Sequence, residues 1–225
     1  MENNDNIWAV LPLKGTEDAK NRLSTILSAD ERADIVTAMA HDMLNTLTSS
    51  NKLSGVIVVS DSQDIQEIAK GYPVEILAES KEKGLSSAVK HAAKTLEGRG
   101  INIMLVIHGD IPFATANDID NLIKVCTPSP SVAIVPCSGK DGTNVMVCSP
   151  PTAIDFHYGK NSFAKHCDLA AHNNIIALGV LNEHLAIDID MPADLKTVYE
   201  NIDSHKLGEK TKAFLKKADI ASRLK

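Results

Sequence analysis

Three cations near the start of the chain are close enough in sequence to bind one anion. Lys14 follows Leu11-Pro12-Leu13 and precedes Gly15, and Lys20 and Arg22 come a few residues later. Pro12 and Gly15 predict a turn whose backbone can approach a ligand closely. The three cations could neutralise a triphosphate and a leaving pyrophosphate. The segment fits neither the Walker loop nor the G-x-G-x-x-G fingerprint. A solvated basic loop, with Arg22 paired to a carboxylate, stays open as the alternative.

Carboxylates follow two apolar segments and could hold a metal ion. Asp110 comes after Ile103–Ile107, and Asp188 and Asp190 end a second apolar stretch. Carboxylate oxygens suit Mg²⁺ on a nucleotide, and Gly109 would let that nucleotide come near the backbone. Alternation along a strand places Asp188 and Asp190 on one face. We predict Asp110 and Asp190 as metal ligands and Asp188 as an orienting or capping group. The alternative for Asp110 is a turn before Pro112.

Two polar loops later in the chain carry hydroxyl groups. Thr143 and Asn144 lie in the first, and Gly159 and Ser162 lie in the second. A helical pattern follows Ser162, which is typical of a helix N-cap. The same open helix N-terminus could bind the anionic group of a phosphorylated small acid.

The segments that must position these residues alternate between strand and helix. Continuous apolar runs predict buried strands, and amphipathic patterns predict helices at 30–47, 62–70 and 86–96. The strand runs are Ile7–Leu11, Val56–Val59, Val74–Leu77, Ile103–Ile107 and Val132–Val135. This order predicts a single α/β domain with a mostly parallel, Rossmann-like sheet between helices. Ligands then bind beyond the carboxyl ends of the strands.

The pattern changes after Pro136. Short strands are predicted at 144–148, 175–180 and 185–189, with a helix at 162–173, so we expect a small antiparallel excursion. A helix beginning near Pro192 closes the domain, which we place at residues 1–203. From Lys206 onward, seven basic residues face two acidic ones. An apolar stripe there (Leu207, Phe214, Leu215, Ile220, Leu224) could dock on the body or on a second copy of the chain, as in a homodimer. A frayed, solvated end is the alternative.

Composition narrows the classes of protein. The 225 residues are 44% hydrophobic with a net charge of −6, which excludes a disordered chain and disfavours nucleic-acid binding over the whole surface. The four cysteines form no C-x-x-C pair, so we expect free thiols in the reducing cytoplasm. With a polar start and no apolar run of ~20 residues, the sequence predicts a protein outside the membrane.

Taken in order, these residues resemble a known family. The segments that carry the resemblance are Lys14-Gly15 to Ala19-Lys20-Asn21-Arg22-Leu23, Gly84-Leu85, Gly109-Asp110-Ile111-Pro112, Gly142-Thr143-Asn144, Gly159 with Ser162-Phe163-Ala164, and Asp188-Ile189-Asp190-Met191-Pro192. They are similar to the 2-phospho-L-lactate guanylyltransferases of deazaflavin (coenzyme F-420) biosynthesis. That family also includes enzymes that use phosphoenolpyruvate or 3-phospho-D-glycerate.

The resemblance implies a nucleotidyltransferase fold that uses GTP and Mg²⁺. A phosphorylated three-carbon acid would attack the α-phosphate and release diphosphate. The resemblance implies that the catalytic residues are Lys14, Lys20, Arg22 and Asp110, and that Asp110 and Asp190 bind the metal. It implies that the nucleotide contacts Leu11, Pro12, Leu13, Lys14, Gly15, Gly84, Ser86 and Gly109. The acceptor acid would contact Thr143, Asn144, Gly159 and Ser162.

Two positions depart from the family pattern. Ser86 stands where the family often has Asn, and His108-Gly109 replaces a smaller pair. The resemblance ends near residue 200, which leaves the basic tail outside it. The rival functions are a cytidylyl- or molybdopterin-type nucleotidyltransferase and a nucleotide-binding regulatory module without turnover.

Overall fold

A seven-stranded sheet forms the centre of the computed structural model, which describes residues 6–17, 19–126, 128–217 and 220–223. The strand order is β3-β2-β1-β4-β6-β5-β7. The bounds are β1 (Ile7–Pro12), β2 (Gly55–Val59), β3 (Glu75–Leu77), β4 (Ile103–Ile107), β5 (Ser131–Pro136), β6 (Thr143–Ser149) and β7 (Ile176–Gly179). Strand β6 runs antiparallel to both β4 and β5, and the other pairings are parallel. The predicted α/β class is confirmed, and the antiparallel excursion is limited to β6.

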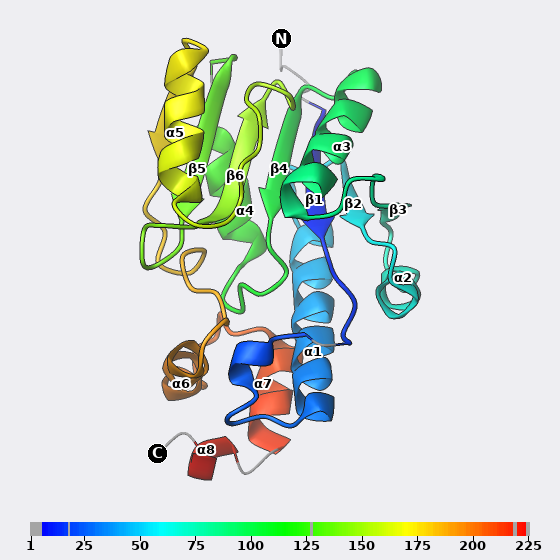
Figure 1. Ribbon diagram of the computed structural model, residues 1–225, viewed down its shortest axis with the longest axis vertical. Coiled ribbons are helices and arrows are strands. Elements are labelled where there is room, and N and C mark those ends of the chain that lie inside the picture. Colours follow the sequence, from blue (N-terminus) through cyan, green and yellow to red (C-terminus); the bar gives the residue numbers. More distant parts are fainter. Residues whose placement is uncertain (1–5, 18, 127, 218–219, 224–225) are drawn as a thin grey trace.

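Helices cover both faces of the sheet, which explains why every residue of β4, β5 and β6 is buried. Helices α1 (Ala29–Thr48), α2 (Gln63–Ala69) and α4 (Ala116–Lys124) pack on one face, and α3 (Leu85–Gly98) and α5 (Ser162–His172) pack on the other. Helix α1 is longer than the strands and continues beyond the sheet (Figure 1). Its projecting part supports a second layer of structure.

That second layer has its own core, beyond the carboxyl ends of β1 and β4. The short helix η1 (Asn21–Leu23), α6 (Pro192–Glu200) and α7 (Glu209–Lys217) gather around α1 there (Figure 1). Leu23, Met39, Leu195 and Leu215 are among its buried side chains. Segments far apart in the sequence therefore meet directly below the sheet edge at which we expect ligands.

The C-terminal segment is docked on this layer. Leu207, Phe214 and Leu215 are buried, as the predicted apolar stripe requires, and the two oxygens of Asp42 accept the backbone N–H groups of Lys210 and Thr211 at 2.9 and 2.8 Å. After α7 comes the short helix α8 (Ile220–Arg223). The side chain of Ile220, and Leu224, lie outside the described residues. The frayed alternative does not hold for the described part of this segment.

Two expectations about elements were wrong or incomplete. Residues 185–189 form no strand, because Leu185 and Ile189 point into two different cores. The segment is instead held by isolated hydrogen bonds, such as the one that the Ser138 N–H donates to the Ala186 carbonyl. Helix α4 was missed, although Thr115 caps it by accepting the Asp118 N–H.

The four cysteines carry free thiols, and Cys126 and Cys148 are buried. Among the described helices, none combines the length and apolar character needed to span a bilayer.

Candidate active site

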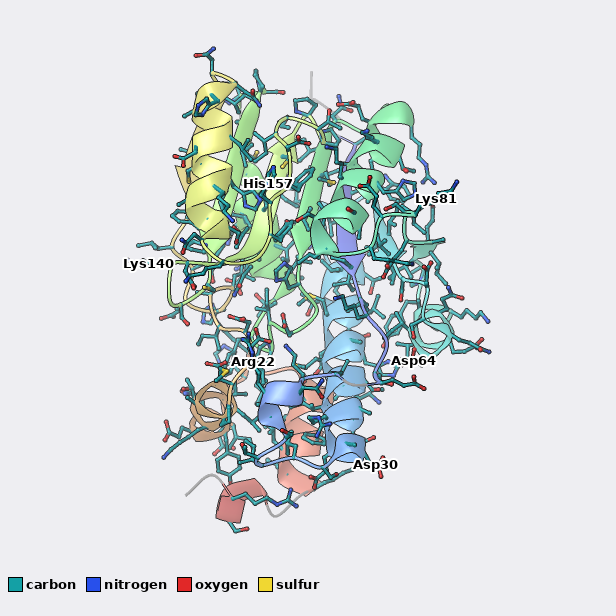
Figure 2. The ribbon with its side chains drawn as sticks, viewed as in Figure 1. Arg22, Asp30, Asp64, Lys81, Lys140 and His157 are labelled. Carbon is teal, nitrogen blue, oxygen red and sulfur yellow. The ribbon has the colours of Figure 1, made fainter. Side chains whose placement is uncertain are left out.

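A cavity of about 550 Å³ opens at the carboxyl ends of β1 and β4. Nine of the residues predicted from the sequence line it: Pro12, Leu13, Lys14, Gly15, Lys20, Arg22, Gly109, Asp110 and Asp190. The cationic loop and the carboxylates thus face one space. Leu11, also predicted to contact the nucleotide, is instead fully buried in the sheet. Figure 2 shows Arg22, a residue of η1, below the sheet.

Lys20 joins the cationic loop to the carboxylates. Its Nζ atom lies 2.5 Å from Asp110 Oδ2 and 2.6 Å from Asp190 Oδ1. Burial opposes the charge on Lys20, but the two carboxylates outweigh it and raise the lysine pKa. Burial likewise opposes the charge on Asp110, and the Lys20 ammonium outweighs it and holds the pKa of that carboxyl below its usual range. Lys20 and Asp110 are therefore charged at neutral pH.

Asp188 completes a group of three carboxylates. Ligand oxygens of Asp110, Asp188 and Asp190 all lie within 4.8 Å of one another. Asp188 accepts a hydrogen bond of 3.2 Å from Asn144 Nδ2 and does not cap a helix. Its burial, reinforced by the negative charge of Asp110, raises the pKa of Asp188 to about 6. Asp188 therefore lies in the cluster itself, and its pKa is shifted in the opposite direction from that of Asp110.

Backbone contacts hold the 188–190 segment against the end of β4. The Ile189 N–H donates to the Asp110 carbonyl at 3.1 Å. Asp194, in the first turn of α6, accepts the N–H groups of Asp190 and Met191 at 3.0 and 2.6 Å. Pro192 at the helix start fits this geometry. Asp190 is thus positioned by the helix that follows it, without a strand.

The loop after β1 is anchored to the start of α2. Asp64 accepts both the N–H and the hydroxyl of Thr16, at 2.8 and 2.6 Å, and also the hydroxyl of Ser62. A Cβ atom added at Gly15 would lie 2.6 Å from Ser62 Oγ, so only glycine fits there. Figure 2 shows Asp64 on the far side of α1 from Arg22 in this view.

The other predicted nucleotide contacts lie beside this loop. Gly84, at a φ of 114°, begins α3 and lines a smaller hollow of about 40 Å³ with Pro12 and Lys14. Ser86 Oγ accepts the Tyr158 N–H at 3.0 Å, so its side chain ties α3 to the 158 loop. At Gly109, an added Cβ would lie 2.3 Å from Leu13 Cδ2. The missing side chain at Gly109 makes room for Leu13.

The predicted acceptor residues form a buried hydrogen-bonded group. Ser162 Oγ donates to Thr143 Oγ1 at 3.3 Å, and both side chains are almost fully buried. Asn144 is also buried and donates to the Leu185 carbonyl at 3.1 Å as well as to Asp188. Gly159 is exposed, at a φ of 108°. The structure brings Thr143 and Ser162 together through the hydrogen bond between their hydroxyl groups, and neither residue lines the large cavity.

Sequence reasoning missed His166, which organises this group. The His157 N–H donates to His166 Nε2 at 2.9 Å, so Nδ1 carries the proton and donates to Thr143 Oγ1 at 3.0 Å. Burial, together with the nearby His157 and Lys165, lowers the pKa of His166 to about 4. Its place one turn after Ser162 was the available signal.

Aromatic rings connect the segment that carries Ser162 and His166 to the segment that carries Asp110. Tyr158 lies between His166 and His108, with ring centroids 5.1 and 5.3 Å away. His108 lines the large cavity beside Asp110. The apolar part of the wall, from Val36 and Met39 of α1, was also missed, because a helical apolar face predicts core packing before it predicts a ligand.

A mostly parallel α/β sheet with a cationic loop facing carboxylates at its carboxyl edge places a site for an anionic ligand where open α/β sheets bind their ligands, and the family match identifies the protein as an enzyme of the nucleotidyltransferase type. The family model described as "Guanylyl transferase CofC like" matches residues 7–225. The chain belongs to this family, which confirms the resemblance found in the sequence. The match also includes the basic tail, which lies beyond the segments that carry the resemblance.

Curated relatives carry three related names. The chain is 31% identical to the phosphoenolpyruvate guanylyltransferase of Sphaerobacter thermophilus, over 84% of this chain and 90% of that protein. It is 32% identical to the 3-phospho-D-glycerate guanylyltransferase of Colwellia psychrerythraea, over 83% and 88%. For the 2-phospho-L-lactate guanylyltransferase of Methanocaldococcus jannaschii the identity is 26%, over 84% and 81%.

Solved structures share the fold. The 4-diphosphocytidyl-2C-methyl-D-erythritol synthase of Anaerococcus prevotii matches with a TM-score of 0.62 at 14% identity, over 88% of this chain and 97% of that one. A candidate nucleotide-diphospho-sugar transferase from Desulfovibrio desulfuricans matches with a TM-score of 0.80 at 17% identity, over 96% and 97%.

Proposed function

We propose that this chain transfers GMP from GTP to a phosphorylated three-carbon acid. An oxygen of the acid's phosphate attacks the α-phosphorus of GTP, the bond to the bridging oxygen of the β-phosphate breaks, and diphosphate leaves with the electron pair. The observation that carries the proposal is the juxtaposition of Lys20 with Asp110 and Asp190 in a cavity that Lys14 and Arg22 also line. Family membership supports guanylyl transfer, and the names of the relatives support the class of acceptor.

In this mechanism the main role of the protein's cations is to neutralise negative charge on the substrates and on the leaving group. The acceptor phosphate is already anionic at neutral pH, so the reaction needs positioning and charge neutralisation more than a strong base. Lys14, Lys20 and Arg22 reach the cavity from one loop and would offset the repulsion between two anions. They would also stabilise the charge that develops on the leaving diphosphate.

The carboxylates fit a divalent cation. Three of them converge within 4.8 Å, and Asp110 Oδ1 is buried with no protein partner among the described residues. Oxygen-only ligands of this kind suit Mg²⁺. Asp110 and Asp190 would hold the ion, and the ion would supply positive charge to polarise the phosphates of the nucleotide. Asp188, fixed by Asn144, would orient the pair.

The test is a search for the product. Purified enzyme is given GTP and Mg²⁺ with 2-phospho-L-lactate, phosphoenolpyruvate or 3-phospho-D-glycerate in turn, and the product is identified by mass spectrometry. We expect one acid to yield a GMP adduct, a substrate for coenzyme F-420 biosynthesis. An adduct from CTP but not GTP would instead support a cytidylyl enzyme. Nucleotide binding without any adduct would support a regulatory module.

A further inference from the structure

We propose that Lys20 is a built-in counter-cation of the carboxylate cluster, and that its ammonium must leave Asp110 and Asp190 before a divalent ion can bind there. The inference rests on the proposed function, because it takes those two aspartates as the metal ligands. It adds a coupling between metal and nucleotide. The metal alone meets a site whose negative charge Lys20 already reduces, whereas the nucleotide offers Lys20 another partner.

The geometry makes the two cations competitors. Lys20 Nζ binds one oxygen of each carboxylate at 2.5 and 2.6 Å, and its side chain is only 13% exposed. A divalent ion held by these carboxylates would sit at 2.0 to about 2.6 Å from its ligand oxygens. Whether it used the oxygens that Lys20 binds or the unpartnered Asp110 Oδ1, it would lie within a few ångströms of the ammonium. At such separations two positive charges repel strongly in a partly buried site.

The backbone around Lys20 is held in place, so the side chain is the part that can move. Lys20 has φ 50° and ψ 43°, in the left-handed region that non-glycine residues seldom adopt. Arg32 fixes the segment on both sides by donating to the carbonyls of Ala19 and Leu27, each at 3.1 Å. A conformation fixed in this way keeps Lys20 at the boundary between the carboxylates and the cavity.

The cavity supplies the second position for the ammonium. Lys20 lines it together with Lys14 and Arg22, where the triphosphate is placed by the proposed function. A nucleotide there would draw the ammonium off the carboxylates as the metal arrives. Because such coupling is reciprocal, the nucleotide raises metal affinity by the same factor by which the metal raises nucleotide affinity.

The test measures Mn²⁺ binding by electron paramagnetic resonance of the free ion, with and without a GTP analogue carrying an α,β-methylene bridge. For the wild type we expect weak binding of Mn²⁺ alone and tighter binding with the analogue. Lys20→Met removes the charge but keeps the length of the side chain. We expect it to bind Mn²⁺ alone about tenfold tighter, with less added by the analogue, since couplings of this kind are typically 5–150-fold.

Two further variants serve as controls. Lys14→Met changes a cation of the same cavity that takes no part in the two ion pairs with Asp110 and Asp190, and it should leave the affinity for Mn²⁺ alone unchanged. Lys20→Arg retains a cation and should bind Mn²⁺ alone as weakly as the wild type. Since Lys20→Met leaves the carboxylates facing each other, its melting temperature should also rise on adding Mn²⁺ more than that of the wild type.

The outcomes separate this inference from the proposed function. If Lys20→Met and wild type bind Mn²⁺ equally, with or without the analogue, the competition is refuted and the metal site stands. If neither protein binds Mn²⁺ even with the analogue, the assignment of Asp110 and Asp190 as metal ligands is refuted, and the inference falls with it.

Discussion

At the scale of single residues, Asp110 combines an ion pair within the fold with the predicted role of metal ligand. It is the residue that both pairs with Lys20 and offers a buried, unpartnered oxygen to the cavity. Asp110→Asn keeps the shape of the side chain but removes its charge, and a neutral amide is a poorer Mg²⁺ ligand. We expect a folded protein whose turnover falls by ~100-fold or more, measured across a Mg²⁺ titration. Activity near the wild-type level at limiting Mg²⁺ would contradict the metal assignment.

Gly15 tests the position of the cationic loop. In Gly15→Ala the new Cβ would meet Ser62 Oγ at 2.6 Å, and Ser62 is held by Asp64. The loop must therefore move away from α2 and take Lys14 with it. We expect GTP affinity to fall about tenfold, a cost of ~1.4 kcal/mol, with the affinity for the acid little changed. Calorimetry with each ligand separately measures this. Gly98→Ala, where an added Cβ meets nothing within 4 Å, is the matched control.

His166 predicts a dependence of stability on pH. Its folded pKa of about 4 lies below the ordinary value of 6.5, so the unfolded chain binds a proton between these values while the folded protein does not. Stability should therefore be complete above pH 6.5 and fall as pH drops toward 4, by up to about 3 kcal/mol from this residue. Urea unfolding of wild type and His166→Asn should show their difference narrowing over this range. Exposed His172→Asn is the control, and a constant difference would refute the assignment.

At the scale of elements, the docking of α7 depends on one side chain of α1. Asp42 accepts the N–H groups of Lys210 and Thr211 and the Thr211 hydroxyl, at 2.7 to 2.9 Å. Losing such a cap typically costs ~1–2 kcal/mol. Asp42→Ala should lower the free energy of unfolding by that amount, measured in denaturant. Asp34→Ala, an exposed change of the same charge on the same helix, should have little effect. Equal losses in both variants would mean that net charge, not the cap, is responsible.

Periodicity predicted most elements, because the apolar residues within a single segment are enough to indicate a buried strand or an amphipathic helix. Strands β1 to β7 and helices α1, α2, α3, α5 and α6 all follow expected segments. The segment 185–189 misled the prediction because its alternation of apolar and acidic residues is also produced by a chain that passes between two cores. The hydrogen bonds of His166 could not be predicted either, since they join α5 to β6 and to the loop that carries His157.

At the scale of the whole molecule, sequence patterns could not predict which segments pack together in the second layer. Leu23, Met39, Leu195 and Phe214 share one core although they come from four distant segments. A pattern predicts that a face is buried but not what it is buried against. The carboxyl-edge rule for parallel sheets did place Lys14, Lys20, Arg22, Asp110 and Asp190 around one cavity. The cavity itself depends on the layer that closes it from below.

The ion pair between Lys20 and Asp190 spans 170 positions of the chain, which has a consequence for synthesis on the ribosome. The parallel strands β1 to β4 are complete by residue 107, whereas Asp190 and the helices α6 and α7 emerge near the end of synthesis. A nascent chain thus carries its cationic loop for most of translation without the second carboxylate that neutralises it. The candidate site is complete only when the final segments have been made, so we expect a polypeptide interrupted before them to form the sheet without Asp190 and to lack activity.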